Sequence, residues 1–119
     1  MFIARQFDVL IFADDLKVDL EYICKAHKSI KEFAYIYHDK DGVKPHYHIY
    51  LNFGRSLISA KIIANWFEIP ESSIYKVKCR KIDMLRDLIH SSLSLKNKHQ
   101  YSPEEVVANF DYFKLISII

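Results

Sequence analysis

The fold of this chain is decided by residues 33–53, which read FAYIYHDKDGVKPHYHIYLNF. Phe33–His38 and His46–Phe53 are rich in β-branched and aromatic residues, and each therefore predicts a strand. Between them, Asp39–Gly42 is a strong turn signal, because Asp and Gly tolerate the backbone conformations of a chain reversal. We therefore expect the two strands to pair as an antiparallel hairpin.

Strand and helix patterns continue on both sides of this hairpin. Arg5–Phe12 is rich in β-forming residues, and Ser73–Arg80 alternates apolar with basic residues, as a half-buried strand does. Helices are predicted at four places, which are a segment capped by Asp14 or Asp15, residues 59–67, residues 82–90 and a final segment beginning at Ser102. In the final segment, Ser102 is the N-cap, Pro103 lies in the first turn and Glu105 completes a capping box.

The element order β-α-β-β-α-β-α, followed by a helix, favours an α+β domain. Such an order suits a ferredoxin-like split-βαβ plan, in which helices pack on one face of an antiparallel sheet. The 119 residues are enough for one domain, and the apolar half of them can fill a core. The net charge of +2 permits nucleic-acid binding without requiring it.

Features that would direct the chain to a membrane or out of the cell are missing from the sequence. It contains no run of about 18 apolar residues, so no transmembrane helix is expected. Charge appears within Met1–Arg5 before a signal-like apolar run develops, so secretion is not expected. Cys24 and Cys79 lack CxxC spacing, and we interpret them as buried thiols in a reducing cytoplasm.

Four side chains of the hairpin form a candidate metal site. His46 and His48 point to one face of their strand because alternate residues of a strand share a face. The hairpin returns His38 beside this pair and places Asp41 in the connecting turn. Three imidazoles and a carboxylate suit a divalent cation such as Mn²⁺, Mg²⁺, Co²⁺ or Zn²⁺. A structural histidine pair without a metal is the alternative interpretation.

Tyr101 is a second candidate functional residue. It directly precedes the capped segment at Ser102, where a side chain can stand clear of the core. Lys96, Lys98 and His99 lie just before it, and cations there favour a nearby phosphate and a developing phenolate. From these residues alone, a packing role for Tyr101 stays equally open.

At this point the sequence resembles the HUH endonucleases, through the His-hydrophobe-His motif of residues 46–48. It is similar in detail to the replication initiator (Rep) proteins of small Gram-positive plasmids, which replicate by rolling circle. Their motifs correspond here to His38–Asp41, Lys44–His48 and Lys98–Tyr101, and Leu88–Ser91 is similar to their Leu-Thr-His stretch. The resemblance extends from about Arg5 to Phe110.

The resemblance implies a metal-dependent enzyme that nicks and rejoins one DNA strand at a replication origin. His38, Asp41, His46 and His48 would hold the cation, with Mn²⁺ or Mg²⁺ expected first. Tyr101 would be the nucleophile and form a 5′-phosphotyrosine link. Unlike many initiators, this chain has Ser-Pro-Glu-Glu rather than an early lysine after the tyrosine.

The resemblance also implies partners and a setting. Single-stranded or hairpin origin DNA would be the substrate in a bacterial cytoplasm, and Lys76, Lys78, Arg80, Lys96 and Lys98 are candidate DNA contacts. The three residues from the predicted strand at 73–80 could equally form a solvated face. Residues 1–119 would be a nuclease domain, complete or a fragment of a longer initiator whose C-terminal region forms homo-oligomers.

Several other functions remain open at this stage. A relaxase or single-tyrosine transposase could use the same scaffold. An origin-binding module that does not cut DNA is a second alternative, and a metal-binding domain unrelated to DNA is a third.

Overall fold

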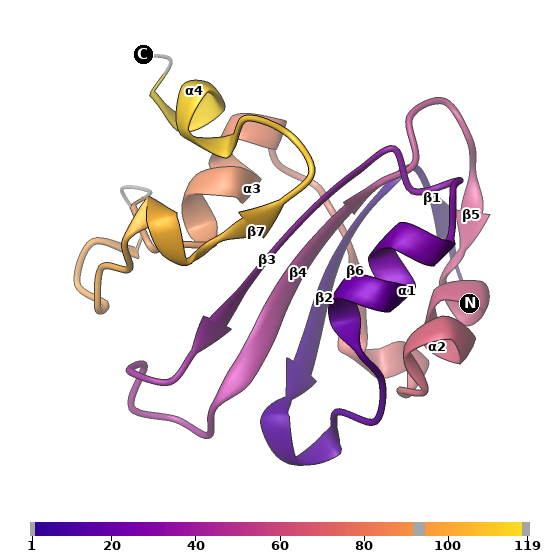
Figure 1. Ribbon diagram of the computed structural model, residues 1–119, viewed down its shortest axis with the longest axis horizontal. Helices are drawn as coiled ribbons and strands as arrows, with labels where there is room; N and C mark the ends of the chain where they lie inside the picture. The colour runs from indigo at the N-terminus through magenta and orange to yellow at the C-terminus, as the bar shows by residue number, and fades with distance from the viewer. Residues whose placement is uncertain (1, 92–94, 118–119) are drawn as a thin grey trace.

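The computed structural model describes residues 2–91 and 95–117 of the chain. Its strands are β1 (Ile3–Ala4), β2 (Gln6–Phe12), β3 (Glu32–His38), β4 (His46–Asn52), β5 (Ile58–Ser59), β6 (Ile74–Lys76) and β7 (Val107–Ala108). Its α-helices are α1 (Leu20–Ala26), α2 (Ala60–Phe67), α3 (Lys81–Asp87) and α4 (Tyr112–Ile116). Figure 1 shows the helices arranged around one twisted sheet.

The sheet is antiparallel and has the strand order β6-β2-β4-β3-β7. The predicted hairpin is confirmed, because β3 and β4 pair along their full length with His38 opposite His46. Gly42 has a φ of 76° in the connecting turn, a conformation that glycine adopts without strain. Strands β1 and β5 form a separate two-stranded pair.

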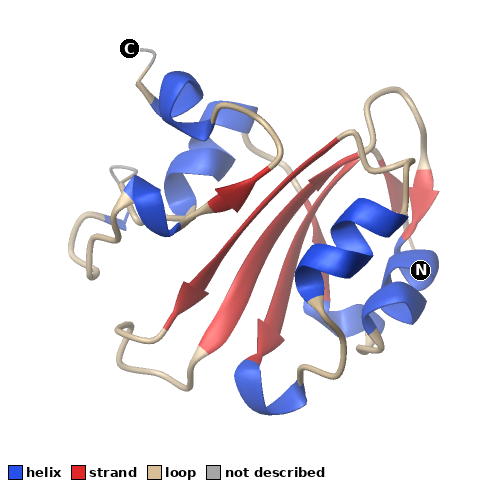
Figure 2. Ribbon diagram, viewed as in Figure 1, coloured by secondary structure: helices blue, strands red, loops and turns tan. Residues whose placement is uncertain are grey.

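Side-chain alternation along the strands separates two apolar clusters. Phe7, Val9 and Ile11 of β2 point toward α1 and α2 and form the larger core cluster. Ala34 and Ile36 of β3 point the other way, into a smaller cluster with α3 and α4. The predicted α+β class and antiparallel sheet are thus confirmed. Helices were predicted on one face of the sheet, but α3 and α4 also pack against β3 on the face opposite α1 and α2 (Figure 2). Each large apolar side chain buried here contributes about 1.5–3 kcal/mol.

The predicted start of the first helix and the predicted length of the strand at residues 73–80 are wrong. The first helix begins at Leu20 because Asp19, rather than Asp14 or Asp15, accepts a hydrogen bond from the Tyr22 N–H at 3.1 Å. The strand predicted at residues 73–80 is limited to β6, which pairs only with residues 7–9 of β2. Lys78 and Arg80 therefore lie beyond the strand, and do not share its face with Lys76.

The segment after Tyr101 also differs from its prediction. The capping box of Ser102 and Glu105 is present, but it caps a single 3-10 turn at Pro103–Glu105 rather than an α-helix. The chain then extends into β7, which the sequence did not predict. Pairing of Ala108 with Ala34 on β3 competes successfully with helix continuation at this point.

The thiols and the membrane expectation can be compared directly with the structure. Both cysteines are free, but Cys24 is buried whereas Cys79 is exposed, so the burial predicted for Cys79 is wrong. Within residues 2–91 and 95–117, no helix is long and apolar enough to span a bilayer.

Candidate active site

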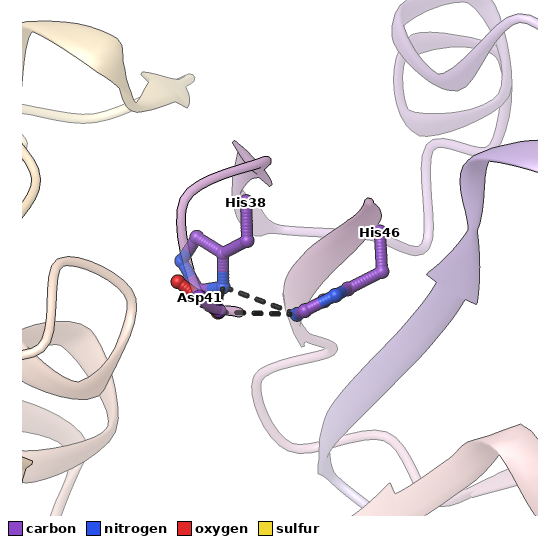
Figure 3. A group of neighbouring side chains, drawn as sticks. All are labelled: His38, Asp41 and His46. Atoms are coloured by element: carbon purple, nitrogen blue, oxygen red, sulfur yellow. Dashed lines mark hydrogen bonds and ion pairs between the residues drawn. The ribbon is translucent and has the colours of Figure 1, made fainter. Parts of the chain in front are cut away.

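The β3–β4 hairpin brings His38, Asp41 and His46 together at one end of the sheet (Figure 3). The Nδ1 atom of His38 lies 3.2 Å from Oδ2 of Asp41 and 3.3 Å from Nε2 of His46. His46 Nε2 lies 3.6 Å from the same carboxylate oxygen. All three ligand atoms are within 4.8 Å of one another, so one cation could contact all of them.

Backbone carbonyl groups fix the orientation of both imidazoles. His38 Nε2 lies 2.6 Å from the Leu88 carbonyl oxygen, and His46 Nδ1 lies 2.9 Å from that of Lys44. A carbonyl oxygen only accepts, so these two ring nitrogens must carry the protons. In the neutral rings, the lone pairs on His38 Nδ1 and His46 Nε2 then face each other and the Asp41 carboxylate. These lone pairs and the carboxylate oxygen repel one another unless a cation lies between them. A divalent metal ion therefore fits this group of ligand atoms.

The protonation of His38 and Asp41 suits the same interpretation. Burial lowers the pKa of His38 to about 4, so the ring is neutral near pH 7. Burial would raise the pKa of Asp41, but the hydrogen bond from Tyr101 and the nearby histidines lower it below its usual range. At neutral pH, the Asp41 carboxylate therefore faces a neutral His38 ring whose Nδ1 atom can donate an electron pair to a metal.

His48, the fourth predicted ligand, is adjacent to this cluster without belonging to it. Its ring centroid is 5.7 Å from that of His38, on the same face of the sheet. Its Nε2 atom is bonded to Oδ1 of Asp8 at 2.5 Å. The structure thus assembles three of the four predicted ligands and pairs the remaining one with Asp8, which sequence analysis missed.

Tyr101 lies directly over the cluster. Its ring stacks on His38 with centroids 4.5 Å apart, and its Oη donates a hydrogen bond to Asp41 Oδ1 at 2.6 Å. The Lys40 N–H donates to the same Oη at 2.9 Å. Only 4% of Tyr101 is exposed, so the expectation of a side chain clear of the core is wrong. Burial, followed by the bond to Asp41, raises the pKa of the phenol to about 12.

His90 also borders the site, although sequence analysis gave it no role. The residue is buried, and its Nε2 atom lies 3.8 Å from Asp41 Oδ2. Its match within Leu88–Ser91 was the signal that could have pointed to it. Of the cations predicted before Tyr101, Lys96 and Lys98 are exposed, and only His99 is in ring contact with the tyrosine, at 4.6 Å.

The other predicted DNA contacts lie near the opposite end of the sheet. Lys76 pairs with Phe7 near the start of β2, whereas His46 pairs with Phe12 at its end. Lys76 lines a cavity of about 230 Å³ together with Arg5 and Lys81. Lys76 and Lys78 have no ion-pair partner among the described residues, whereas Arg80 is paired with Asp83 at 2.8 Å.

Comparisons with known proteins agree with the coarser part of the resemblance noted in the sequence, which is a similarity to plasmid replication proteins. A family model described as "Plasmid replication protein, origin binding domain" matches residues 3–113. The chain is also 39% identical over 114 residues to a protein of Onion yellows phytoplasma (strain OY-M) named "Replication protein". That match covers 81% of this chain and 29% of the relative, so the chain spans less than a third of the relative's length.

Proposed function

Because the chain belongs to the family of plasmid replication protein origin-binding domains, we propose that it binds and nicks one strand of a replication origin. The proposed enzyme is a metal-dependent endonuclease of the HUH type, which remains attached to the 5′ phosphate through Tyr101. The observation that carries this proposal is the position of Asp41. Its carboxylate faces His38 and His46 with one oxygen and accepts the Tyr101 hydrogen bond with the other.

The metal would be held by His38, Asp41 and His46, with His48 the next nearest predicted ligand. When bound, a divalent ion would polarise the scissile phosphate and offset the charge that develops on it. Mn²⁺ and Mg²⁺ are the ions we expect first, because oxygen ligands from phosphate and water would complete the coordination of either.

The protein's own residues would prepare the nucleophile. Tyr101 Oη forms the new bond to phosphorus while the bond from phosphorus to the 3′ oxygen breaks. Asp41 Oδ1 is placed to accept the phenol proton, and the departing 3′ oxygen takes a proton from water to become a free hydroxyl. The Lys40 N–H already donates to Oη and would stabilise negative charge there. The free 3′-OH can then prime DNA synthesis, and the phosphotyrosine bond can be reversed to rejoin strands.

The burial of Tyr101 limits which form of DNA can bring a phosphate to its hydroxyl group. Since Tyr101 is buried, a phosphate can reach Oη only after the residues that cover the ring move aside. An unpaired strand, whose backbone can approach a buried side chain, meets this requirement better than a duplex does. Hairpin DNA with an unpaired loop is therefore the proposed substrate.

The basic residues at the other end of the sheet would position the DNA rather than cut it. Arg5 and Lys76 line the same cavity, and Lys78 is exposed nearby in sequence. Contacts from lysine and arginine to phosphates hold DNA in register without reading its sequence. We assign this supporting role to Lys76 and Lys78, with Lys96 and Lys98 as further candidates close to Tyr101.

The proposal is tested with a pool of hairpin oligonucleotides that carry randomised loops and a label at the 3′ end. Wild-type protein and Tyr101→Phe are incubated with the pool and Mn²⁺ and separated on a denaturing protein gel. We expect label to migrate with wild-type protein only, and EDTA to abolish it. If the hairpins are bound by both proteins but never linked, the chain is a binding module. The buried, high-pKa phenol is the observation that favours this second function.

A further inference from the structure

We propose that His90 is a positioning residue, which holds Tyr101 over the His38–Asp41–His46 cluster by tying the segment before Tyr101 to the end of α3. The inference rests on the proposed function of Tyr101 and adds a residue to its machinery. His90 is neither the nucleophile nor one of the ligands predicted from the sequence.

Two hydrogen bonds join the end of α3 to the tyrosine segment. His90 Nδ1 lies 2.9 Å from the carbonyl oxygen of His99, and this nitrogen must carry a proton because a carbonyl only accepts. The Tyr101 N–H donates to the Ile89 carbonyl oxygen at 3.1 Å. Residues 89–90 are thus hydrogen-bonded to residues 99 and 101, on both sides of Gln100. These two bonds fix the position of the Tyr101 backbone, and therefore of its Cβ atom.

The backbone at His90 indicates that its side chain is needed. The Ser91 N–H donates to Arg86 O at 3.0 Å and the His90 N–H donates to Asp87 O at 3.2 Å, which is the Schellman pattern of a helix end. His90 occupies the left-handed position of this motif with a φ of 62°. Glycine is favoured there because other residues are strained at positive φ. Because a histidine occupies a strained position that favours glycine, we infer that its imidazole has a functional role.

The His90 ring fills the space between the tyrosine and the cluster. Its centroid is 4.7 Å from that of His38 and 5.4 Å from that of Tyr101, to which it is edge-on. Only 4% of the residue is exposed. Within the described parts of the chain, the ligand atoms that lie within 4.8 Å of one another belong to His38, Asp41 and His46. His90 does not belong to this group, so we assign it to positioning rather than to metal ligation.

Three substitutions of His90 distinguish the contributions of the backbone turn, of the hydrogen bond to His99 and of metal binding. His90→Gly keeps the favoured backbone turn but removes the side-chain bond. His90→Asn tolerates positive φ and places an amide N–H near the position of Nδ1. His90→Gln keeps polarity but places its amide near the position of Nε2, away from His99.

Two kinds of measurement are made on each variant. The first is the single-turnover nicking rate at saturating hairpin DNA and Mn²⁺, alongside the Kd for each ligand. The second is the hydrogen-exchange rate of the Tyr101 amide by NMR in metal-free protein, which requires no activity. We expect His90→Gly and His90→Gln to lose about 10- to 100-fold in rate, because a small misplacement of a nucleophile has effects of this size. Both Kd values should stay within about twofold of wild type, and Tyr101 amide exchange should accelerate.

The His90→Asn variant decides the inference. If it restores the nicking rate and the amide protection, positioning through the His99 bond is supported. Positioning is overturned if His90→Gly behaves as wild type in both measurements, or if Mn²⁺ affinity falls in His90→Asn, since a ligand role is then indicated. If wild-type protein does not nick at all, the proposed function fails, and the Tyr101 amide exchange still decides the role of His90.

Discussion

The buried hydroxyl of Tyr101 predicts that Tyr101→Phe destabilises the metal-free protein. The substitution removes the hydrogen bond to the charged Asp41 and the acceptor of the Lys40 N–H, at 2.6 and 2.9 Å. A hydrogen bond to a charged group contributes about 1.5–3 kcal/mol, and a neutral one about 0.5–1.5 kcal/mol. Because Lys40 is exposed and water can replace Oη there, we expect the free energy of unfolding to fall by about 2–4 kcal/mol in total.

Urea unfolding in EDTA measures this change directly. Trp66 is the sole tryptophan and stacks on His27 with ring centroids 3.9 Å apart, so its fluorescence should report the loss of tertiary structure. Tyr75→Phe is the matched control, because Tyr75 is 54% exposed and should change stability by no more than about 0.5 kcal/mol. If Tyr101→Phe is as stable as this control, Oη is not held by Asp41 and the described geometry is wrong.

Three further predictions concern the metal, the DNA and the thiols. Asp41→Asn removes the carboxylate charge from the cluster and should weaken Mn²⁺ binding by at least about 10-fold in calorimetry; unchanged affinity would exclude Asp41 as a ligand. Lys76→Glu should reduce the slope of log K against log salt for hairpin binding by about one, whereas Lys114→Glu on α4 should leave it unchanged. Equal slopes for the two variants would remove Lys76 from the interface. At pH 8, a maleimide should label the exposed Cys79 and leave Cys24 unlabelled, because burial raises the pKa of Cys24 to about 12. Mass spectrometry of folded and urea-unfolded protein checks this, and rapid labelling of folded Cys24 would contradict its burial.

The part of the site that could be predicted from the sequence is its local part. His38 and His46 are eight residues apart, and hairpin pairing alone places them opposite each other. Asp41 lies in the turn between them, so no long-range contact is needed to bring it close. The capping box at Ser102 and Glu105 was predictable for the same reason, although three residues of helix were too few to resist pairing of the next segment with β3.

The parts that could not be predicted depend on contacts between distant segments. Asp8 reaches His48 only because β2 pairs beside β4, and Tyr101 reaches Asp41 across sixty positions of the chain. The burial of Tyr101 depends on its stacking on His38, which no periodicity near residue 101 reveals. Likewise, the length of β6 is set by its three-residue pairing with β2 rather than by the alternation of residues 73–80.

The central claim, that DNA becomes attached to Tyr101, is tested most directly by locating the covalent bond. After reaction of the hairpin pool with Mn²⁺ and wild-type protein, nuclease trimming would leave a short nucleotide adduct for tryptic mass spectrometry. Cleavage after Lys98 and Lys114 yields a peptide with two tyrosines, Tyr101 and Tyr112, so fragmentation must distinguish them. We predict the adduct on Tyr101 alone. An adduct on Tyr112 or any other residue, or cut DNA with no adduct, would contradict the account.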